Sequence, residues 1–131
     1  MTSIVKQHVL VVDDDEDTAE VLGELLRAHG RVVSIATSGR AALVLCASFT
    51  HDVALIDIMM PTMDGYELAG ELRSHGVTCR LIAVSGRAPD EDRQRALDAG
   101  FGAYLVKPVG VQALLAVLSP ILPSTRSLRT R

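Results

Sequence analysis

Carboxylate, hydroxyl and ammonium side chains follow four short apolar runs in this sequence, each at the point where the run ends. They are the pair Asp13-Asp14 after residues 9–12, Asp57 after 53–56, Ser85 after 81–84 and Lys107 after 103–106. Carboxylates held close together repel one another, so a cluster of this kind usually binds a cation. With oxygen ligands alone and no His or Cys beside them, Mg²⁺ or Mn²⁺ suits the site better than Zn²⁺.

The same set of side chains could support phosphoryl transfer. Asp57 stands alone at the end of its run, and a carboxylate in such a position can act as a nucleophile that forms an aspartyl phosphate. Lys107 offers a positive charge for phosphate oxygens, and Ser85 offers a small hydrogen-bond donor. A Mg²⁺ ion with open coordination positions can also bind phosphate oxygens. All of this requires the four segments to meet in space.

Short apolar runs alternate with helical patterns along the chain. Strands are predicted at 9–12, 31–36, 53–56, 81–84 and 103–106, and helices at 18–29, 38–47, 66–75, 90–99 and 111–118. Five strands alternating with five helices predict an α/β fold with right-handed crossovers and a parallel sheet covered on both faces. Ligand sites in such sheets lie beyond the carboxyl ends of the strands. The side chains named above are therefore expected to converge on one rim.

The acidic block at 13–17 has a simpler interpretation that has to be weighed first. Acidic residues favour the first turn of a helix because its dipole is positive there. We accept this for Asp15, Glu16 and Asp17, with Asp15 as the N-cap. Asp13 and Asp14 directly end a buried strand, which favours a role in the site. Lys107 or Ser85 alone would indicate only a turn or loop, and their joint placement is what points to function.

Composition and length predict one soluble domain. The chain has 131 residues, of which 48% are hydrophobic and 3% aromatic, so aliphatic side chains must form the core. No apolar run reaches the roughly 20 residues needed to cross a bilayer, and the N-terminus lacks a secretory signal. Cys46 and Cys79 lie far apart in the sequence, which favours free thiols and a cytoplasmic location. The net charge of −3 gives no field for nucleic acid.

Three segments together resemble the response-regulator receiver family of two-component signalling. They are Val9–Asp15 (VLVVDDD), Leu55–Gly65 (LIDIMMPTMDG) and Ala103–Pro108 (AYLVKP). The resemblance covers roughly residues 7–122. It implies a receiver domain over 1–122 with a flavodoxin-like (βα)5 doubly wound fold and strand order 2-1-3-4-5. A mobile tail over 123–131 is expected to follow.

The resemblance also implies a role for each site residue. Asp57 would be the phosphorylated aspartate, and Asp14, Asp57 and the backbone carbonyl of Met59 would ligate Mg²⁺, for which Mn²⁺ could substitute. Asp13 would act mainly through a bound water. Lys107 would pair with Asp57 at rest and with the phosphoryl group afterwards.

The remaining implied roles concern the switch and the phosphoryl lifetime. Ser85 would turn its hydroxyl towards the phosphoryl group, and Tyr104 would swing inward as Ser85 moves. The Lys107-Pro108 bond would be cis. Met59 and Arg87 occupy positions that tune the lifetime of the acyl phosphate, in a direction that the sequence does not predict. The protein would be a phosphoacceptor switch with at most self-phosphorylation and self-dephosphorylation activity, and not an enzyme in the usual sense.

The implied phosphodonor is a phosphohistidine on a histidine kinase or a histidine phosphotransfer domain. The last helix suggests a second contact, because no charged residue occurs between Val109 and Pro123. Its face bearing Gln112, Ala113, Ala116 and Val117 could dock a partner or neighbouring domain, or simply face water. We expect a monomer or weak dimer, with no direct binding of nucleic acid and no membrane association.

Three other functions have to be compared with this one. A Mg²⁺-dependent phosphatase with an Asp nucleophile would use Asp13 and Asp15, but Asp17 stands where Thr or Val belongs. A flavin-binding electron carrier would need a hydroxyl-rich loop where this chain has five acids. A receiver-like module that is never phosphorylated would not need every side chain of the set. The chain could be a stand-alone receiver or a module of a longer protein, such as a hybrid histidine kinase.

Overall fold

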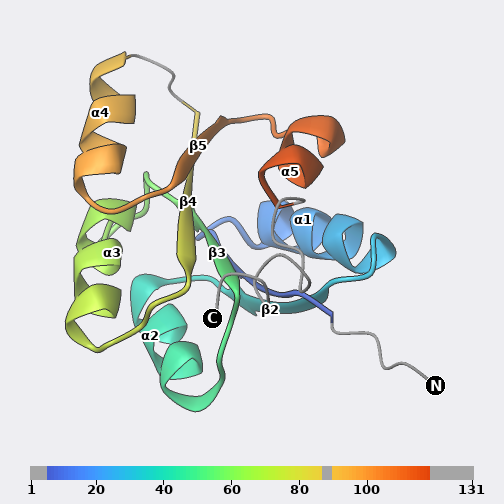
Figure 1. Cartoon of the computed structure of the whole chain (residues 1–131), viewed down its shortest axis with the longest axis horizontal. Helices are drawn as coiled ribbons and strands as arrows, with labels where there is room; N and C mark the ends of the chain where they lie inside the picture. The colour runs from blue at the N-terminus through green and yellow to red at the C-terminus, as the bar shows by residue number, and fades with distance from the viewer. Residues whose placement is uncertain (1–5, 87–89, 119–131) are drawn as a thin grey trace, which may run out of the picture.

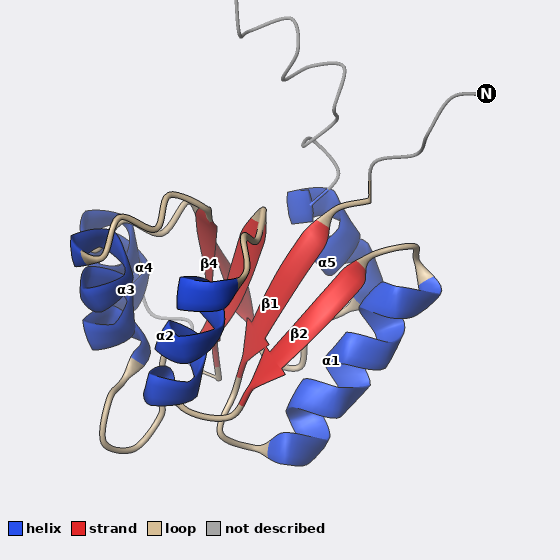
Figure 2. Ribbon diagram, turned by 90° about the horizontal axis from the view of Figure 1, so that it is seen from below, coloured by secondary structure: helices blue, strands red, loops and turns tan. Residues whose placement is uncertain are grey.

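The protein, described by a computed structural model over residues 6–86 and 90–118, is a five-stranded parallel sheet between two layers of helices (Figures 1 and 2). The strand order is β2-β1-β3-β4-β5, as predicted. The elements are β1 His8–Val12, α1 Glu16–Ala28, β2 Val32–Ala36, α2 Gly39–Ser48, β3 Val53–Asp57, α3 Gly65–Ser74, β4 Arg80–Ser85, α4 Asp90–Asp98, β5 Ala103–Val106 and α5 Val111–Leu118.

The alternating side chains of the central strands fill two separate cores. Leu10 and Ile56 belong to the core under α2, α3 and α4, whereas Val11 and Leu55 belong to the core under α1 and α5. Figure 2 shows these two helix layers on opposite faces of the sheet. Because β1 and β3 are buried on both faces, their sequences are continuous apolar runs that stop where the chain leaves the core. That stop places the polar residues at the rim.

Capping side chains explain most helix starts. Asp15 accepts a hydrogen bond from the backbone N–H of Asp17, and Ser38 accepts one from Ala41, so both predicted N-caps are confirmed. Helix α1 begins at Glu16, two residues before the predicted start, because the acidic residues after the cap already form its first turn. Gly30 has a φ of 84° just past the end of α1, in the left-handed region that glycine favours.

Helix α5 shows a narrower exposed face than predicted. Leu114 and Leu118 are fully buried, and Gln112, Ala113 and Ala116 are exposed. Val117, which we expected on the exposed side, is half-buried and packs in part against the core beneath α1 and α5, so that prediction holds only in part. Among the described helices, none is long and apolar enough to span a membrane. Arg87 and the tail at 123–131 lie outside the described residues.

Candidate functional site

Four neighbouring strands bring the predicted site residues to one rim of the sheet. Val12 pairs with Ile56, Asp57 with Val84, and Ser85 with Val106, so the carboxyl ends of β1, β3, β4 and β5 lie level with one another. One carboxylate oxygen from each of Asp13, Asp14 and Asp57 lies within 4.8 Å of the other two. The sequence prediction that these acids meet is confirmed.

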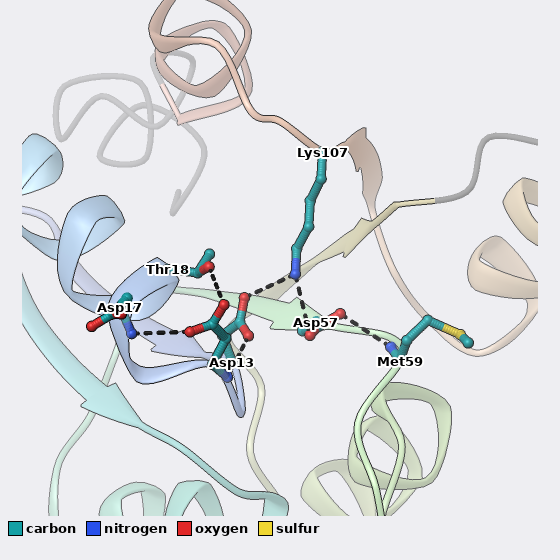
Figure 3. Close-up of polar contacts among 7 residues, drawn as sticks. Asp13, Asp17, Thr18, Asp57, Met59 and Lys107 are labelled. Carbon is teal, nitrogen blue, oxygen red and sulfur yellow. Dashed lines mark hydrogen bonds and ion pairs between the residues drawn. The ribbon is translucent and has the colours of Figure 1, made fainter.

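Lys107 reaches from the end of β5 into this carboxylate cluster (Figure 3). Its Nζ lies 3.0 Å from Oδ2 of Asp13 and 3.3 Å from Oδ2 of Asp57. The expected pair with Asp57 is present, and the ammonium group is shared with Asp13, to which it lies nearer. The backbone N–H of Lys107 donates to the carbonyl of Ser85 at 2.8 Å, which ties the lysine to the end of β4. The Lys107-Pro108 bond is cis, as the resemblance implied.

Because these charged side chains are buried, each of them strongly affects the pKa of its neighbours. Asp13 and Asp57 are 2% and 4% exposed, whereas Asp14 is exposed. Burial, together with the negative charge of Asp13, raises the pKa of Asp57 from 3.8 to about 6, although Met59 and Lys107 oppose the shift. Burial alone would lower the pKa of Lys107, but its hydrogen bond to Asp13 and the charge of Asp57 raise it. Lys107 therefore remains a cation between two carboxylates.

Backbone groups orient both buried carboxylates. Oδ1 of Asp13 accepts from the N–H of Asp15 at 2.9 Å, and Oδ1 of Asp57 accepts from the N–H of Met59 at 3.1 Å. In both cases Oδ2 is the oxygen that faces Lys107. Each carboxylate thus has one oxygen held by the chain and one directed to the cation.

The loop after Asp57 contains a requirement that the sequence interpretation missed. A Cβ on Gly65 would lie 2.9 Å from the carbonyl oxygen of Asp57 and 2.8 Å from Cα of Ile58. The N–H of Gly65 donates to the carbonyl of Ile58 at 2.9 Å, so the start of α3 is pressed against the end of β3. Asp64 and Glu67 form a capping box there. The close approach of α3 to this strand end is a tertiary contact, which no local sequence pattern signals.

The two predicted switch residues are both buried. Ser85 is 1% exposed at the end of β4, and the Tyr104 ring on β5 is 8% exposed. Tyr104 is therefore already buried in this structure, whereas we expected it to swing inward as Ser85 moves. Met59 is 56% exposed beside Asp57, on the open side of the site.

A cavity of about 500 Å³ adjoins the site between α1 and the segment after β5. Asp17 and Val21 line it from α1, and Lys107, Pro108 and Val109 line it from the other side. Val21 is 64% exposed, which is high for a valine on a helix that also packs against the core. The cavity gives access from solvent to the neighbourhood of Lys107.

Comparison with known proteins decides the family. The family described as the response regulator receiver domain matches residues 9–119 of this chain. The chain belongs to the response regulator receiver family. A 14.6 kDa uncharacterised protein of Leptolyngbya boryana is 38% identical to this receiver over 120 residues, which are 90% of this chain and 92% of that protein. Response regulator MprA of Mycolicibacterium vanbaalenii is 39% identical over 90% of this chain, and the receiver spans about half of MprA, 51% of its length.

Solved receiver structures superimpose closely on this one. The receiver domain of the Francisella response regulator 1452 has a TM-score of 0.84 at 30% identity, covering 92% of this receiver and 99% of that chain. The chemotaxis protein CheY4 of Vibrio cholerae also has a TM-score of 0.84, at 28% identity, covering 90% of this receiver and 100% of that chain. The confirmed strand order and these superpositions agree on the CheY-like flavodoxin fold.

The carboxylate cluster of this receiver fits a hard divalent cation. Three acids offer oxygen ligands within 4.8 Å of one another, and two of these acids are buried with no cation nearby other than the Lys107 ammonium group among the described residues. The all-oxygen donor set suits Mg²⁺ or Mn²⁺. The acidic triad is typical of the receiver metal site, and receivers are phosphoacceptors in phosphorelay signalling.

Proposed function

We propose that this receiver takes a phosphoryl group from a phosphohistidine onto Asp57, in a Mg²⁺-dependent reaction. The observation that carries the proposal is a buried carboxylate held between a lysine and two further acids at the end of a central strand. An Oδ atom of Asp57 attacks phosphorus, the P–N bond to the donor imidazole breaks, and the imidazole leaves with its electron pair. The product on this chain is an aspartyl phosphate.

The residues around Asp57 have separate tasks in this proposal. Asp14, Asp57 and the backbone carbonyl of Met59 would hold Mg²⁺ directly, with Asp13 acting through a water; Mn²⁺ could take its place. When bound, the ion supplies positive charge to the phosphoryl oxygens. Lys107 would supply further positive charge, and its backbone is held in place by the carbonyl of Ser85. Asp13 keeps the ammonium group at the rim when no phosphoryl group is present.

The switch follows as a population shift. The phosphoryl group favours the arrangement in which both Ser85 and Lys107 contact it, because only there is its charge fully compensated. Movement of Ser85 is coupled to Tyr104, which lies on the neighbouring strand. The partner that supplies the phosphoryl group is a histidine kinase or a histidine phosphotransfer domain.

The phosphatase alternative lacks support from the geometry. It requires Asp13 and Asp15 to act together, but Asp15 caps α1 and accepts hydrogen bonds from Thr18 and Asp17. The residue that joins Asp13 and Asp14 is Asp57, from another strand. We therefore expect one phosphoryl group per chain, with slow self-dephosphorylation, in place of sustained turnover.

Incubation with acetyl phosphate and Mg²⁺ tests the proposed function. The intact mass is expected to rise by one phosphoryl group, which resists acid and is removed by base or hydroxylamine, because acyl phosphates react in this way. Omitting Mg²⁺ and adding a chelator should prevent uptake. The continuous release of many phosphate equivalents would instead support the phosphatase, and an unchanged mass would support a module that is never phosphorylated.

Mg²⁺ is expected to stabilise the folded receiver in a pH-dependent way. An ion that binds only the folded state at ten times its dissociation constant adds about 1.4 kcal/mol to the free energy of unfolding. Asp57 has a pKa raised to about 6, so protons compete with the ion below that pH. Thermal melts with and without Mg²⁺, at matched ionic strength, should therefore differ at pH 8 and converge near pH 5. Identical melting at pH 8 over a range of Mg²⁺ concentrations would rule out the metal site.

A further inference from the structure

Helix α4 has little apolar surface with which to pack on the domain. Of its nine residues, the apolar ones are Ala96, which is 1% exposed, and Leu97, which is 50% exposed. A surface helix normally carries three or four apolar residues in every two turns. Other contacts must therefore hold α4 against its neighbours.

Two arginines of α4 supply such contacts by lying over tyrosine rings. The guanidinium carbon of Arg93 lies 5.5 Å from the ring centre of Tyr104 on β5. That of Arg95 lies 4.0 Å from the ring centre of Tyr66 on α3. Figure 1 shows α4 next to both elements. The hydroxyl of Tyr66 also donates to the backbone carbonyl of Asp92 at 3.4 Å, so the α3 side of the helix has two attachments.

The ring beneath Arg93 shares a face of the sheet with Ser85. Tyr104 pairs with Ala83 in β4, and both belong to the core under α2, α3 and α4. Side chains alternate along a strand, so Ser85, two residues after Ala83, is directed to the same face. Arg93 thus covers a ring that lies diagonally across from the predicted switch hydroxyl.

We propose that Arg93 is a positioning residue that holds the Tyr104 ring in its inward position through a cation–π contact. The contact ties α4 to the ring whose position the phosphoryl group biases, which would explain why Tyr104 is already buried here. The proposal rests on the proposed function only for its link to phosphorylation. Its structural part concerns the unphosphorylated protein.

The structural part can be measured without any phosphodonor. The sequence has no Trp and two Tyr residues, so 3-fluorotyrosine labelling gives two ¹⁹F signals, which Tyr66→Phe assigns. In Arg93→Met, accessibility of the Tyr104 ring to a soluble paramagnetic probe is expected to rise roughly two- to fivefold, the population change that loss of one exposed cation–π contact produces. Arg93→Lys keeps the cation and should change the accessibility of the Tyr104 ring less.

Arg95→Met is the matched control on the same helix. It should alter the Tyr66 signal and leave the Tyr104 signal close to that of the parent protein. Unchanged Tyr104 accessibility in Arg93→Met would overturn the proposal. An equal change of Tyr104 accessibility in Arg95→Met would also overturn it, because α4 would then act as a whole. The same holds if Tyr104 is as accessible in Arg93→Lys as in Arg93→Met.

Phosphorylation gives a second readout that a merely structural arginine would not change. The parent ring is already inward, so acetyl phosphate and Mg²⁺ should alter its signal only slightly. In Arg93→Met fewer rings start inward, and the same treatment should produce a larger change that restores the parent signal. Equal responses in the two proteins, with uptake confirmed by mass, would contradict the inference. If neither protein gains mass, the proposed function fails, while the phosphodonor-free comparison still decides the role of Arg93.

Discussion

Asp57→Asn is expected to abolish phosphoryl uptake and, at the same time, to make the metal-free receiver more stable at pH 8. The amide cannot form an acyl phosphate under these conditions, so the mass should not change with acetyl phosphate and Mg²⁺. The gain in stability has a different cause. Asp57 is buried beside Asp13, and its pKa of about 6 means that folding costs free energy once the carboxylate is ionised.

The pH dependence of this gain has a definite sign. The unfolded chain loses the Asp57 proton near pH 4, whereas the folded protein keeps it to about pH 6. The parent protein therefore loses stability relative to the neutral variant as the pH rises from 4 to 6, and the difference is constant above that range. We expect a plateau of about 1–2 kcal/mol in denaturant unfolding, because Lys107 already compensates part of the repulsion.

Asp17→Asn is the control for this variant. Asp17 lies on the same rim, in the first turn of α1, but outside the carboxylate triad. It should keep phosphoryl uptake and lose about 0.3–1 kcal/mol of stability, because it interacts favourably with the helix dipole. A phosphoryl group on Asp57→Asn with the lability of an acyl phosphate would move the acceptor elsewhere. A variant less stable than the parent at pH 8 would contradict the repulsion between Asp57 and Asp13.

The residues at the rim of the sheet could be predicted because buried strands have a simple sequence pattern. A strand covered on both faces is apolar until it leaves the core, so the first polar residue after the run marks the strand end. That is why the positions of Asp13, Asp57, Ser85 and Lys107 were correctly inferred to converge. The N-caps Asp15 and Ser38 were predictable for a similar reason, since the hydrogen bonds they make are local.

Features that depend on contacts between distant segments were not predictable in this way. Lys107 lies nearer to Asp13 than to Asp57, and this choice depends on side-chain conformations at the ends of three strands. The arginine of α4 that covers Tyr104 belongs to a helix with no apolar pattern to orient it. The exposure of Val117 was overestimated, because a periodic pattern predicts the face of the helix on which a side chain lies and not how far the neighbouring core extends around that helix.

Lys107→Met is expected to have the second large effect, because it leaves Asp13 and Asp57 buried without their cation. In metal-free protein at pH 8 we expect a loss of about 1–3 kcal/mol, less than for a fully buried ion pair since the Lys107 side chain is 28% exposed. The loss should shrink towards pH 5, where Asp57 takes up a proton. It should also be smaller in an Asp57→Asn background, which a double-mutant cycle would measure.

The same substitution should slow phosphoryl uptake and change the response to Mg²⁺. Loss of one preorganised charge at the transferring group typically costs about 10²–10³ in rate. Mg²⁺ should stabilise Lys107→Met more than the parent protein, because the ion then relieves repulsion that the lysine no longer compensates.

Lys107→Arg should retain most of the stability but less of the rate, since the planar guanidinium cannot take the place of a compact ammonium between two Oδ2 atoms. Lys6→Met, at the other lysine of the chain, should change neither property. If Lys107→Met kept parental stability and uptake, the shared lysine would not be part of the site, and the charge balance proposed for Asp57 would have to be replaced.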